Sequence, residues 1–201
     1  MTPPTDSVPL QIAWQRQLAG STGMIFAFAW GLAEATFFFI IPDVLLSFVA
    51  MFAWPRSWRH ILVAITGALV GGALLFHWAT ADPVQARQAI LRVPFIRESM
   101  LMKVDDGLRN QGLPAIFFGS LSGIPYKLYA VEAPKFCRPG EFLLATAPAR
   151  AVRFLLAWFG FGALANWLRN RRGWQTVRLL RVHAAIWIVC YGFYWGRIAF
   201  G

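Results

Sequence analysis

The chain has 201 residues, of which 58% are hydrophobic and only 14% are charged, and its mean hydropathy is +0.52. Soluble domains are nearer half apolar and a quarter charged, so this composition excludes an ordinary soluble domain. The net charge of +10 does not indicate a nucleic-acid-binding module, because the arginines cluster between apolar runs and no zinc-ligand spacing or RNA-binding motif accompanies them.

Residues 1–22 are predicted to form a polar, interfacial N-terminal segment. They contain three prolines, one acidic residue and one arginine, and no short apolar core ends in a small-residue cleavage site, so no signal peptide is expected. Residues 23–201 are predicted to form a single membrane domain, because no Ser/Gly-rich linker divides them.

The first apolar stretch covers residues 23–54 and contains Glu34, Pro42 and Asp43. As one helix it would be about 48 Å long, which exceeds the hydrocarbon core of about 30 Å, whereas two crossings would need roughly 40 residues and a turn. Pro42 disfavours helix at Ile41. The stretch is therefore predicted to be a re-entrant hairpin with its tip near residues 41–43.

Residues 60–80 are predicted to be a conventional transmembrane span. Gly67 and Gly71 are four residues apart on this span, and small residues at this spacing let a second helix approach closely. We interpret both glycines as packing residues.

Residues 82–112 alternate between apolar and polar side chains with a helical period. Asp82 and Pro83 are typical of an N-cap and a first helical position, and Gly112 is a plausible C-terminal stop. One apolar stripe is formed by Ile96, Met100, Leu101, Val104 and Leu108. The segment is predicted to be an amphipathic helix, with a candidate break at Pro94, that lies in the membrane interface.

Residues 113–133 form a second apolar stretch that glycines and a proline interrupt. Irregular backbone at membrane depth persists only where protein buries it or where it lines a wet cavity. Two interrupted apolar segments in the two halves of a chain are typical of a transporter's binding site. We therefore predict a second hairpin here, and the sequence leaves open whether it re-enters or crosses the bilayer.

Two further spans are predicted at residues 141–168 and 179–200. Trp187, Tyr191, Tyr194 and Trp195 are expected in the aromatic belt at the membrane surface. The fold class that results is an all-α integral membrane protein with two re-entrant helical hairpins, about three transmembrane helices and one interfacial helix. Positive charges are spread almost evenly over the two sides, so the orientation is not predicted.

Charged residues within or beside the apolar runs are the candidate functional residues, because each unpaired charge at the bilayer centre costs about 2.5–3.5 kcal/mol on insertion scales. Glu34 and Asp43 are candidates for proton coupling. Lys127, Arg150 and Arg153 are candidates for binding a phosphate group, and Arg150 and Arg153 share one helix face. The remaining candidate is Glu132. Alternatively these charges only hold the hairpins together as buried ion pairs. A second alternative is that Glu132, Glu141 and Arg153 lie at the membrane interface and extend their charged ends into water.

A catalytic alternative rests on Ser122, which precedes Gly123 in an apolar context and has His183 as a candidate base. The glycine that intramembrane serine proteases carry two residues before the nucleophile is replaced by Ser120. We therefore rank an intramembrane hydrolase third and do not expect an enzyme.

Two segments of the chain share a pattern of acids, glycines and prolines with one membrane protein family. The first is Ala33-Glu-Ala-Thr-Phe-Phe-Phe-Ile-Ile-Pro-Asp43, and the second is Phe117-Phe-Gly-Ser-Leu-Ser-Gly-Ile-Pro-Tyr-Lys127, which a helix over residues 103–112 precedes. In order and spacing they resemble the paired hairpins of the DedA family, also called the SNARE-associated or VTT-domain family, and its YqaA-like branch in particular. The resemblance spans about residues 23–168.

This resemblance implies paired re-entrant hairpins and proton-linked translocation of a phospholipid or of polyprenyl phosphate. By position, Glu34 and Asp43 match the membrane acids of the family. Lys127 stands where the second of two hairpin arginines is common, whereas Ser120-Leu121 fill the place of the first. Lysine offers a point charge rather than a bidentate fork, and we infer that Arg150 or Arg153 supplies the missing fork.

The leading hypothesis is therefore a multi-pass transporter of an anionic lipid in the cell (inner) membrane. Its expected partners are membrane lipids with anionic head groups, and homo-oligomerisation is left open. No nucleic acid, cofactor or metal is expected. The alternative from a different class is a membrane-organising or assembly protein whose buried ion pairs are structural.

Overall fold

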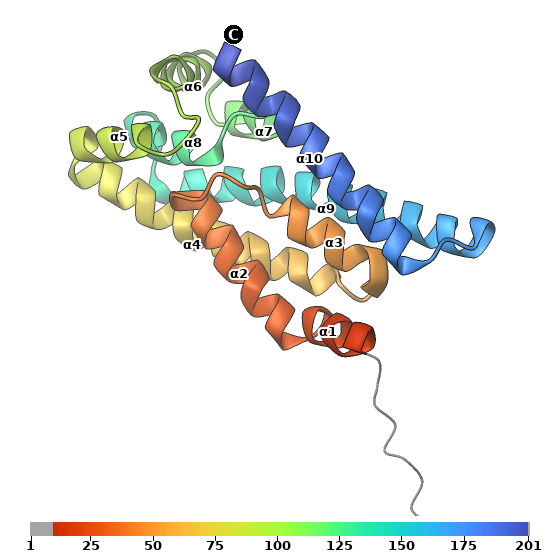
Figure 1. Cartoon of the computed structure of the whole chain (residues 1–201). Coiled ribbons are helices and arrows are strands. Elements are labelled where there is room, and N and C mark those ends of the chain that lie inside the picture. Colours follow the sequence, from red (N-terminus) through yellow and green to blue (C-terminus); the bar gives the residue numbers. More distant parts are fainter. Residues whose placement is uncertain (1–9, 201) are drawn as a thin grey trace, which may run out of the picture.

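The computed structural model describes residues 10–200, and the side chains of residues 13–196. Within this part of the chain all regular structure is helical, so the predicted all-α class is confirmed (Figure 1). The elements are α1 (Leu10–Ala19), α2 (Ser21–Thr36), α3 (Asp43–Ala53), α4 (Trp58–Ala81), α5 (Pro83–Leu91), α6 (Glu98–Gln111), α7 (Pro114–Ser122), α8 (Tyr126–Glu132), the 3-10 turn η1 (Ala133–Lys135), α9 (Pro139–Arg172) and α10 (Thr176–Phe200).

Three helices of the described chain, α4, α9 and α10, are long and apolar enough to cross a membrane. They coincide with the spans predicted at 60–80, 141–168 and 179–200, and each begins two or three residues earlier than predicted. Gly173, with φ of 64°, ends α9 and turns the chain into α10. The length and composition of these three helices indicate a membrane protein.

Helices α2 and α4 pack with their backbones in close contact. A Cβ atom added to Gly67 would lie 2.2 Å from the carbonyl oxygen of Phe28, and one added to Gly31 would lie 2.2 Å from that of Ala64. No side chain larger than hydrogen fits at either position. The packing role that the sequence predicts for Gly67 is therefore confirmed, and its partner is α2.

Two helix–bend–helix units contain the short helices. In the first unit, α2 and α3 are joined by a bend over residues 37–42; in the second, α7 and α8 are joined by residues 123–125, where Gly123 has φ of 84°. The longest of α3, α7 and α8 has 11 residues, or about 16 Å at 1.5 Å per residue. None of these three helices could cross a hydrocarbon core of about 30 Å.

The two units pack on α4 and α9 in an equivalent manner. In the first unit, α2 packs on α4, the span that follows it, and α3 packs on α9. In the second unit, α7 packs on α9, again the span that follows, and α8 packs on α4. The segments α2–α4 and α7–α9 therefore occupy corresponding positions, with the two spans exchanged.

The predicted amphipathic segment 82–112 is divided into α5 and α6, and the division lies at the candidate break of Pro94. The break over residues 92–97 contains Pro94 and Phe95, and Phe95 has φ of 67°. The predicted start and stop are both present. The Asp82 side chain accepts a 2.9 Å hydrogen bond from the Gln85 backbone N–H, and Gly112 ends α6 with φ of 65°.

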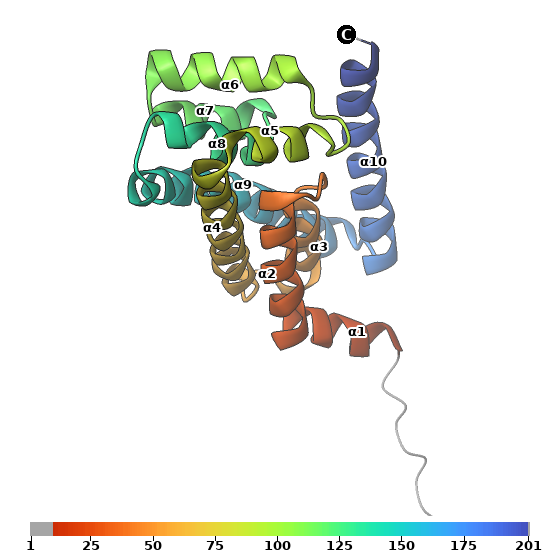
Figure 2. The ribbon, with the colours of Figure 1, turned by 90° about the vertical axis from the view of Figure 1, so that its left-hand side faces the viewer.

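Helix α6 buries its apolar stripe against protein. Leu101, Val104 and Leu108 are all buried, because α6 lies on α7 and α8 at the end of the molecule opposite α1 (Figure 2). The stripe was predicted to lie in the membrane interface. The periodicity of a helix shows that an apolar face exists, but the second unit rather than lipid covers it here.

Candidate functional site

The structure brings together five of the six predicted site residues in the middle of the molecule. Glu34 lies in the last turn of α2, Asp43 is the first residue of α3, and Lys127 is the second residue of α8. All three therefore flank the bends of the two units. Arg150 and Arg153 reach the same place from α9.

Two ion pairs join the first unit to α9. The Arg150 Nη2 atom lies 2.8 Å from Oε2 of Glu34, and the Arg153 Nη2 atom lies 3.1 Å from Oδ2 of Asp43. The side chain of Arg150 is completely buried, whereas that of Arg153 is 16% exposed. Removing either partner of such a pair would leave an uncompensated charge in a medium of low polarity.

Lys127 joins the two bends directly. Its Nζ atom donates a 2.8 Å hydrogen bond to the carbonyl oxygen of Phe38 in the first bend. The lysine is only 2% exposed, and no acidic side chain of the described residues lies within ion-pair distance of it. A buried ammonium group whose one protein partner is a neutral carbonyl is an attractive partner for an anion.

The guanidinium groups have more donors than the surrounding protein accepts. Arg150 lies over the ring of Tyr126, with its Cζ atom 4.1 Å from the ring centroid. Its Nε and Nη1 atoms, and the Nε atom of Arg153, have no hydrogen-bond partner among the described residues. With three basic and two acidic side chains, the cluster carries a net charge of +1 when all five are ionised.

A cavity of about 320 Å³ opens beside this cluster. Glu34, Lys127 and Arg153 form its charged floor. Its walls come mainly from the two bends, the residues between α5 and α6, and α10, and they are largely aromatic and aliphatic. A concave, mostly apolar site with a few convergent polar groups is the usual form of a small-molecule site.

Helix α10 supplies an aromatic wall that the sequence interpretation missed. Trp187, Tyr191, Tyr194 and Trp195 line the cavity, whereas they were predicted to form a belt at the membrane surface. The Tyr191 hydroxyl accepts a 2.9 Å hydrogen bond from the Ile41 N–H, and the Tyr194 hydroxyl donates a 3.1 Å hydrogen bond to the Gly123 carbonyl. The signal in the sequence was their spacing, which places all four on one helix face.

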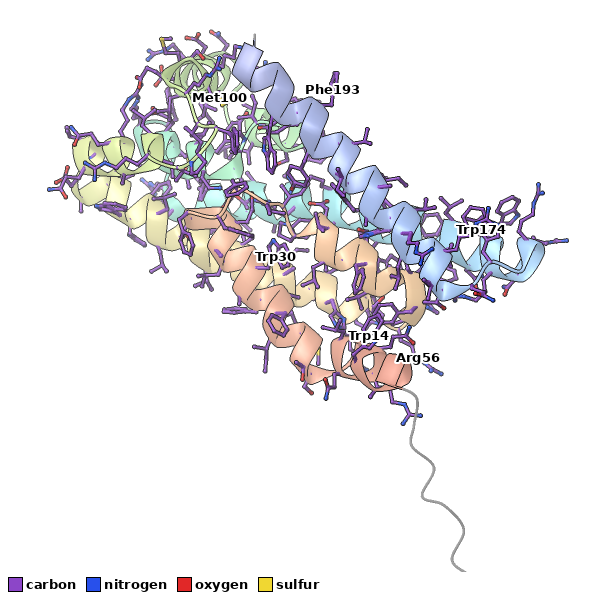
Figure 3. The ribbon with its side chains drawn as sticks, in the orientation of Figure 1. Trp14, Trp30, Arg56, Met100, Trp174 and Phe193 are labelled. Carbon is purple, nitrogen blue, oxygen red and sulfur yellow. The ribbon has the colours of Figure 1, made fainter. Side chains whose placement is uncertain are left out.

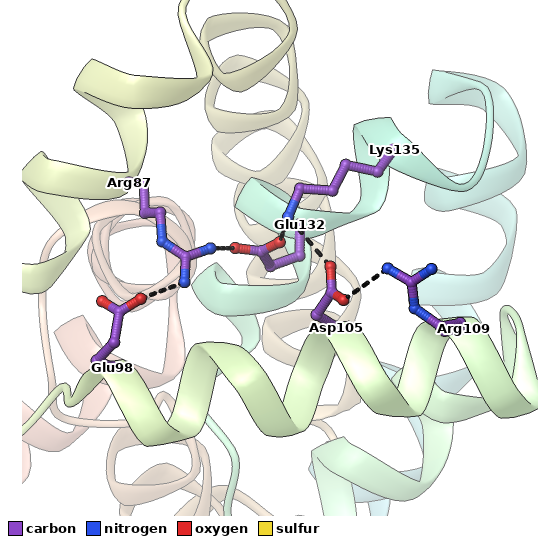
Figure 4. A network of polar contacts seen from close by, with 6 residues as sticks. All are labelled: Arg87, Glu98, Asp105, Arg109, Glu132 and Lys135. Carbon is purple, nitrogen blue, oxygen red and sulfur yellow. Dashed lines mark hydrogen bonds and ion pairs between the residues drawn. The ribbon is translucent and has the colours of Figure 1, made fainter.

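Glu132, the sixth predicted residue, lies in a different cluster at the α6 end of the molecule (Figure 4). It pairs with Arg87 at 2.6 Å and with Lys135. The cluster links α5, α6, α8 and η1, and its further members are Glu98, Asp105 and Arg109. Hydrogen bonds from Lys135 and Arg109 hold the pKa of Asp105 below its usual value.

Ser122 and His183, the pair considered for hydrolysis, are engaged with other partners. The Ser122 hydroxyl donates to the Gly119 carbonyl at 3.2 Å, and the His183 Nε2 atom lies 2.9 Å from the hydroxyl oxygen of Ser47. Ser47 is fully buried. The described structure therefore presents neither serine to a substrate together with this histidine.

Comparisons of the chain with known proteins found no matching protein-family model, no similar curated protein and no similar solved structure.

Proposed function

We propose that the protein is a DedA-like transporter that moves an anionic lipid, a phospholipid or polyprenyl phosphate, across the cell (inner) membrane. The observation that carries the proposal is the buried cluster of net positive charge whose N–H donors exceed their acceptors and which forms the floor of the cavity. Lys127 and Arg153, which line the cavity, bind the phosphate group. Arg150 lies behind them and is paired with Glu34.

The free donors favour an anion as the ligand. A buried donor without an acceptor costs about 1–3 kcal/mol, and more when it is charged. Arg150 and Arg153 each retain free N–H groups, and Lys127 has a carbonyl as its only hydrogen-bond partner among the described residues. A phosphate group in the cavity offers several charged oxygens and would accept donors from Lys127 and Arg153, the two basic residues that line the cavity.

The cavity walls favour an anion that carries a hydrocarbon chain. The charged floor is continuous with a wall of α10 aromatic residues and with Phe39, Phe95 and Ile124. A simple inorganic anion would leave this apolar surface uncovered, whereas a lipid would place its head group on the floor and its chain along the wall.

The arrangement of the short helices supports re-entrant hairpins around the site. Helices α3, α7 and α8 are too short to cross, and the bends of both units meet in the middle of the molecule through Lys127. Paired discontinuous helices that meet at the bilayer midplane are typical of secondary transporters with inverted repeats. We propose that the two units enter the membrane from opposite sides and that the chain is multi-pass.

The competing function is that of a membrane-organising protein in which the charges only stabilise the fold. The two buried ion pairs, Glu34–Arg150 and Asp43–Arg153, favour this alternative. Lys127 separates the two hypotheses, because it has no acidic ion-pair partner among the described residues and lies near Arg150 and Arg153. As a structural residue its removal should cost stability; as a ligand-binding residue its removal should cost transport.

The test is lipid movement in liposomes that contain the purified protein. We expect Lys127→Met to slow the movement of a fluorescent phospholipid or of polyprenyl phosphate at least about tenfold, because a hydrogen bond to a charged group contributes about 1.5–3 kcal/mol. The protein should remain folded at the temperature of the assay, although the loss of the hydrogen bond to Phe38 lowers its melting temperature in detergent. Lys135→Met removes a lysine from the α6-end cluster, and this control should transport normally.

Two results would contradict the proposal. One is an unmodified protein that moves neither class of lipid faster than protein-free liposomes do. The other is a Lys127→Met protein that transports at the normal rate, or that loses transport only because it unfolds.

A further inference from the structure

Seven exposed arginines lie at the α1 end of the molecule, and we refer to them as the arginine face. They come from α1, from the segment around the start of α4, and from the turn that joins α9 to α10. The members are Arg16, Arg56, Arg59, Arg171, Arg172, Arg178 and Arg181.

Packing around the end of α3 holds these three segments together. Trp14 of α1 contacts Phe48 and Phe52 of α3. At the other side of α3, Arg169 of α9 donates a 2.7 Å hydrogen bond to the carbonyl of Met51. Figure 3 shows Trp14, Arg56 and Trp174 toward this end, away from Met100 of α6.

The two ends of the molecule differ in their acidic residues rather than in their basic ones. Among the described side chains, the α1 end has eight arginines and no acidic residue, for a net charge of +8. The α6 end has seven basic and six acidic residues, for a net charge of +1. Five ion-pair contacts join several of these opposite charges at the α6 end. The arginine face has no such partner among the described residues.

Tryptophan rings accompany the arginine face. The Cζ atom of Arg178 lies 4.0 Å from the ring centroid of Trp174, and that of Arg172 lies 5.8 Å from that of Trp167. Trp58 and Trp167 are about half exposed. Tryptophan prefers the head-group level of a bilayer, so the arginines it contacts are held at the depth where lipid phosphates lie.

We propose that the arginine face binds the anionic head groups of the cytoplasmic leaflet, and that the α1 end is therefore the cytoplasmic end of the protein. The partner is a membrane surface rich in anionic phospholipid, which attracts juxtamembrane basic residues. At the α6 end, acidic residues offset most of the positive charge, and we place this end on the opposite side of the membrane. This surface is separate from the cavity, and the inference does not depend on transport.

The first experiment measures lipid binding by the purified, reconstituted protein. The probe is spin-labelled phosphatidylglycerol, with spin-labelled phosphatidylcholine as the neutral reference. We expect the protein to select phosphatidylglycerol, less so as salt rises, because salt screens exposed charges. Replacing Arg171, Arg172, Arg178 and Arg181 together by Gln should remove most of this selectivity.

The control replaces four exposed basic residues of the α6 end, Arg92, Arg97, Lys103 and Arg138, by Gln. It removes the same number of charges and should retain the selectivity for phosphatidylglycerol. Equal losses in both variants, or no selectivity in the unmodified protein, would overturn the proposal. Binding of a short single-stranded RNA in preference to phosphatidylglycerol vesicles would overturn it as well.

The second experiment locates the two ends in the cell membrane. In a protein without its native cysteines, Gln175→Cys marks the arginine face and Gly140→Cys marks the α6 end, and both positions are exposed. A membrane-impermeant thiol reagent should label Gly140→Cys in intact cells, and should label Gln175→Cys only in inverted vesicles. The reverse pattern would refute the assignment of the cytoplasmic end.

Discussion

The ring of Tyr126 lies between α4 and the charged cluster. It is 1% exposed, stacks on Phe142 with ring centroids 5.7 Å apart, and carries Arg150 on its face. Its hydroxyl reaches the backbone of α4, where a Cβ atom added to Gly72 would lie 2.0 Å away. A glycine on a span therefore fixes the position of an aromatic ring, and that ring fixes the position of the most buried arginine.

At the scale of single residues, we predict that Gly72→Ala destabilises the protein. Tyr126 cannot move aside without displacing Phe142 or Arg150, and overpacking of this kind costs about 1–3 kcal/mol. Thermal unfolding in detergent measures the effect. Gly160→Ala is the matched control, because nothing lies within 4 Å of its added Cβ on α9 and alanine favours helix over glycine. Equal melting temperatures for the two variants would contradict the packing argument.

Helix α10 is attached to the rest of the molecule by few contacts, and two of them reach the bends. Of the three candidate spans it is the least buried: 11% of its apolar 18-residue stretch is buried inside the protein, compared with 44% of the corresponding stretch of α4. Tyr191 binds the first bend and Tyr194 binds the second, while Trp195 stacks on Phe95 with ring centroids 4.9 Å apart. The helix thus connects both units across the open side of the cavity.

We expect Tyr191→Phe to free the backbone N–H of Ile41. Hydrogen exchange at this amide should accelerate about two- to tenfold, as the loss of one hydrogen bond of about 0.5–1.5 kcal/mol predicts. Tyr194→Phe removes a donor to the Gly123 carbonyl instead, so exchange at Ile41 should stay unchanged. If both variants accelerate it equally, the two tyrosines act through the general packing of α10 and not through separate bends.

In the molecule as a whole, acidic side chains of the first unit lie opposite basic side chains of the second unit and of α9. Glu34 of the first unit faces both Arg150 and the cavity. In the proposed transport, a lipid phosphate in the cavity competes with this carboxylate for the neighbouring basic side chains, and a proton on Glu34 removes the competition. In the same proposal, rocking of one unit against the other exposes the site to each side in turn.

At the scale of the whole molecule we predict that lipid movement responds to a pH gradient across the liposome membrane. Glu34→Gln mimics the protonated acid permanently, so any remaining movement should be the same with and without the gradient. Glu141→Gln is the control, because this exposed residue caps α9 and glutamine preserves the cap. A gradient response that survives in Glu34→Gln would exclude this residue as the proton carrier.

Local rules were sufficient for much of the fold. The spans follow from the length of the apolar runs, the end of α6 from Gly112, and the first bend from Pro42. The same rules single out Glu34, Asp43, Lys127 and Arg150, because a charge in an apolar run is costly wherever the chain places it. Their proposed roles in transport stay predictions.

The amino-acid sequence by itself indicated an all-helical chain with three helices apolar enough to span a membrane, gave their positions to within a few residues, and showed which charged residues must find partners. Only the tertiary structure decided that Glu132 pairs at the α6 end, that the α10 aromatic residues line a cavity, and that the arginine face has no acidic partner among the described residues. The physical reason is that helix formation depends on neighbours three or four residues apart. The partner of a buried charge or of an aromatic face comes instead from distant segments of the chain. Ile41 and Tyr191, which are joined by a hydrogen bond, are 150 residues apart.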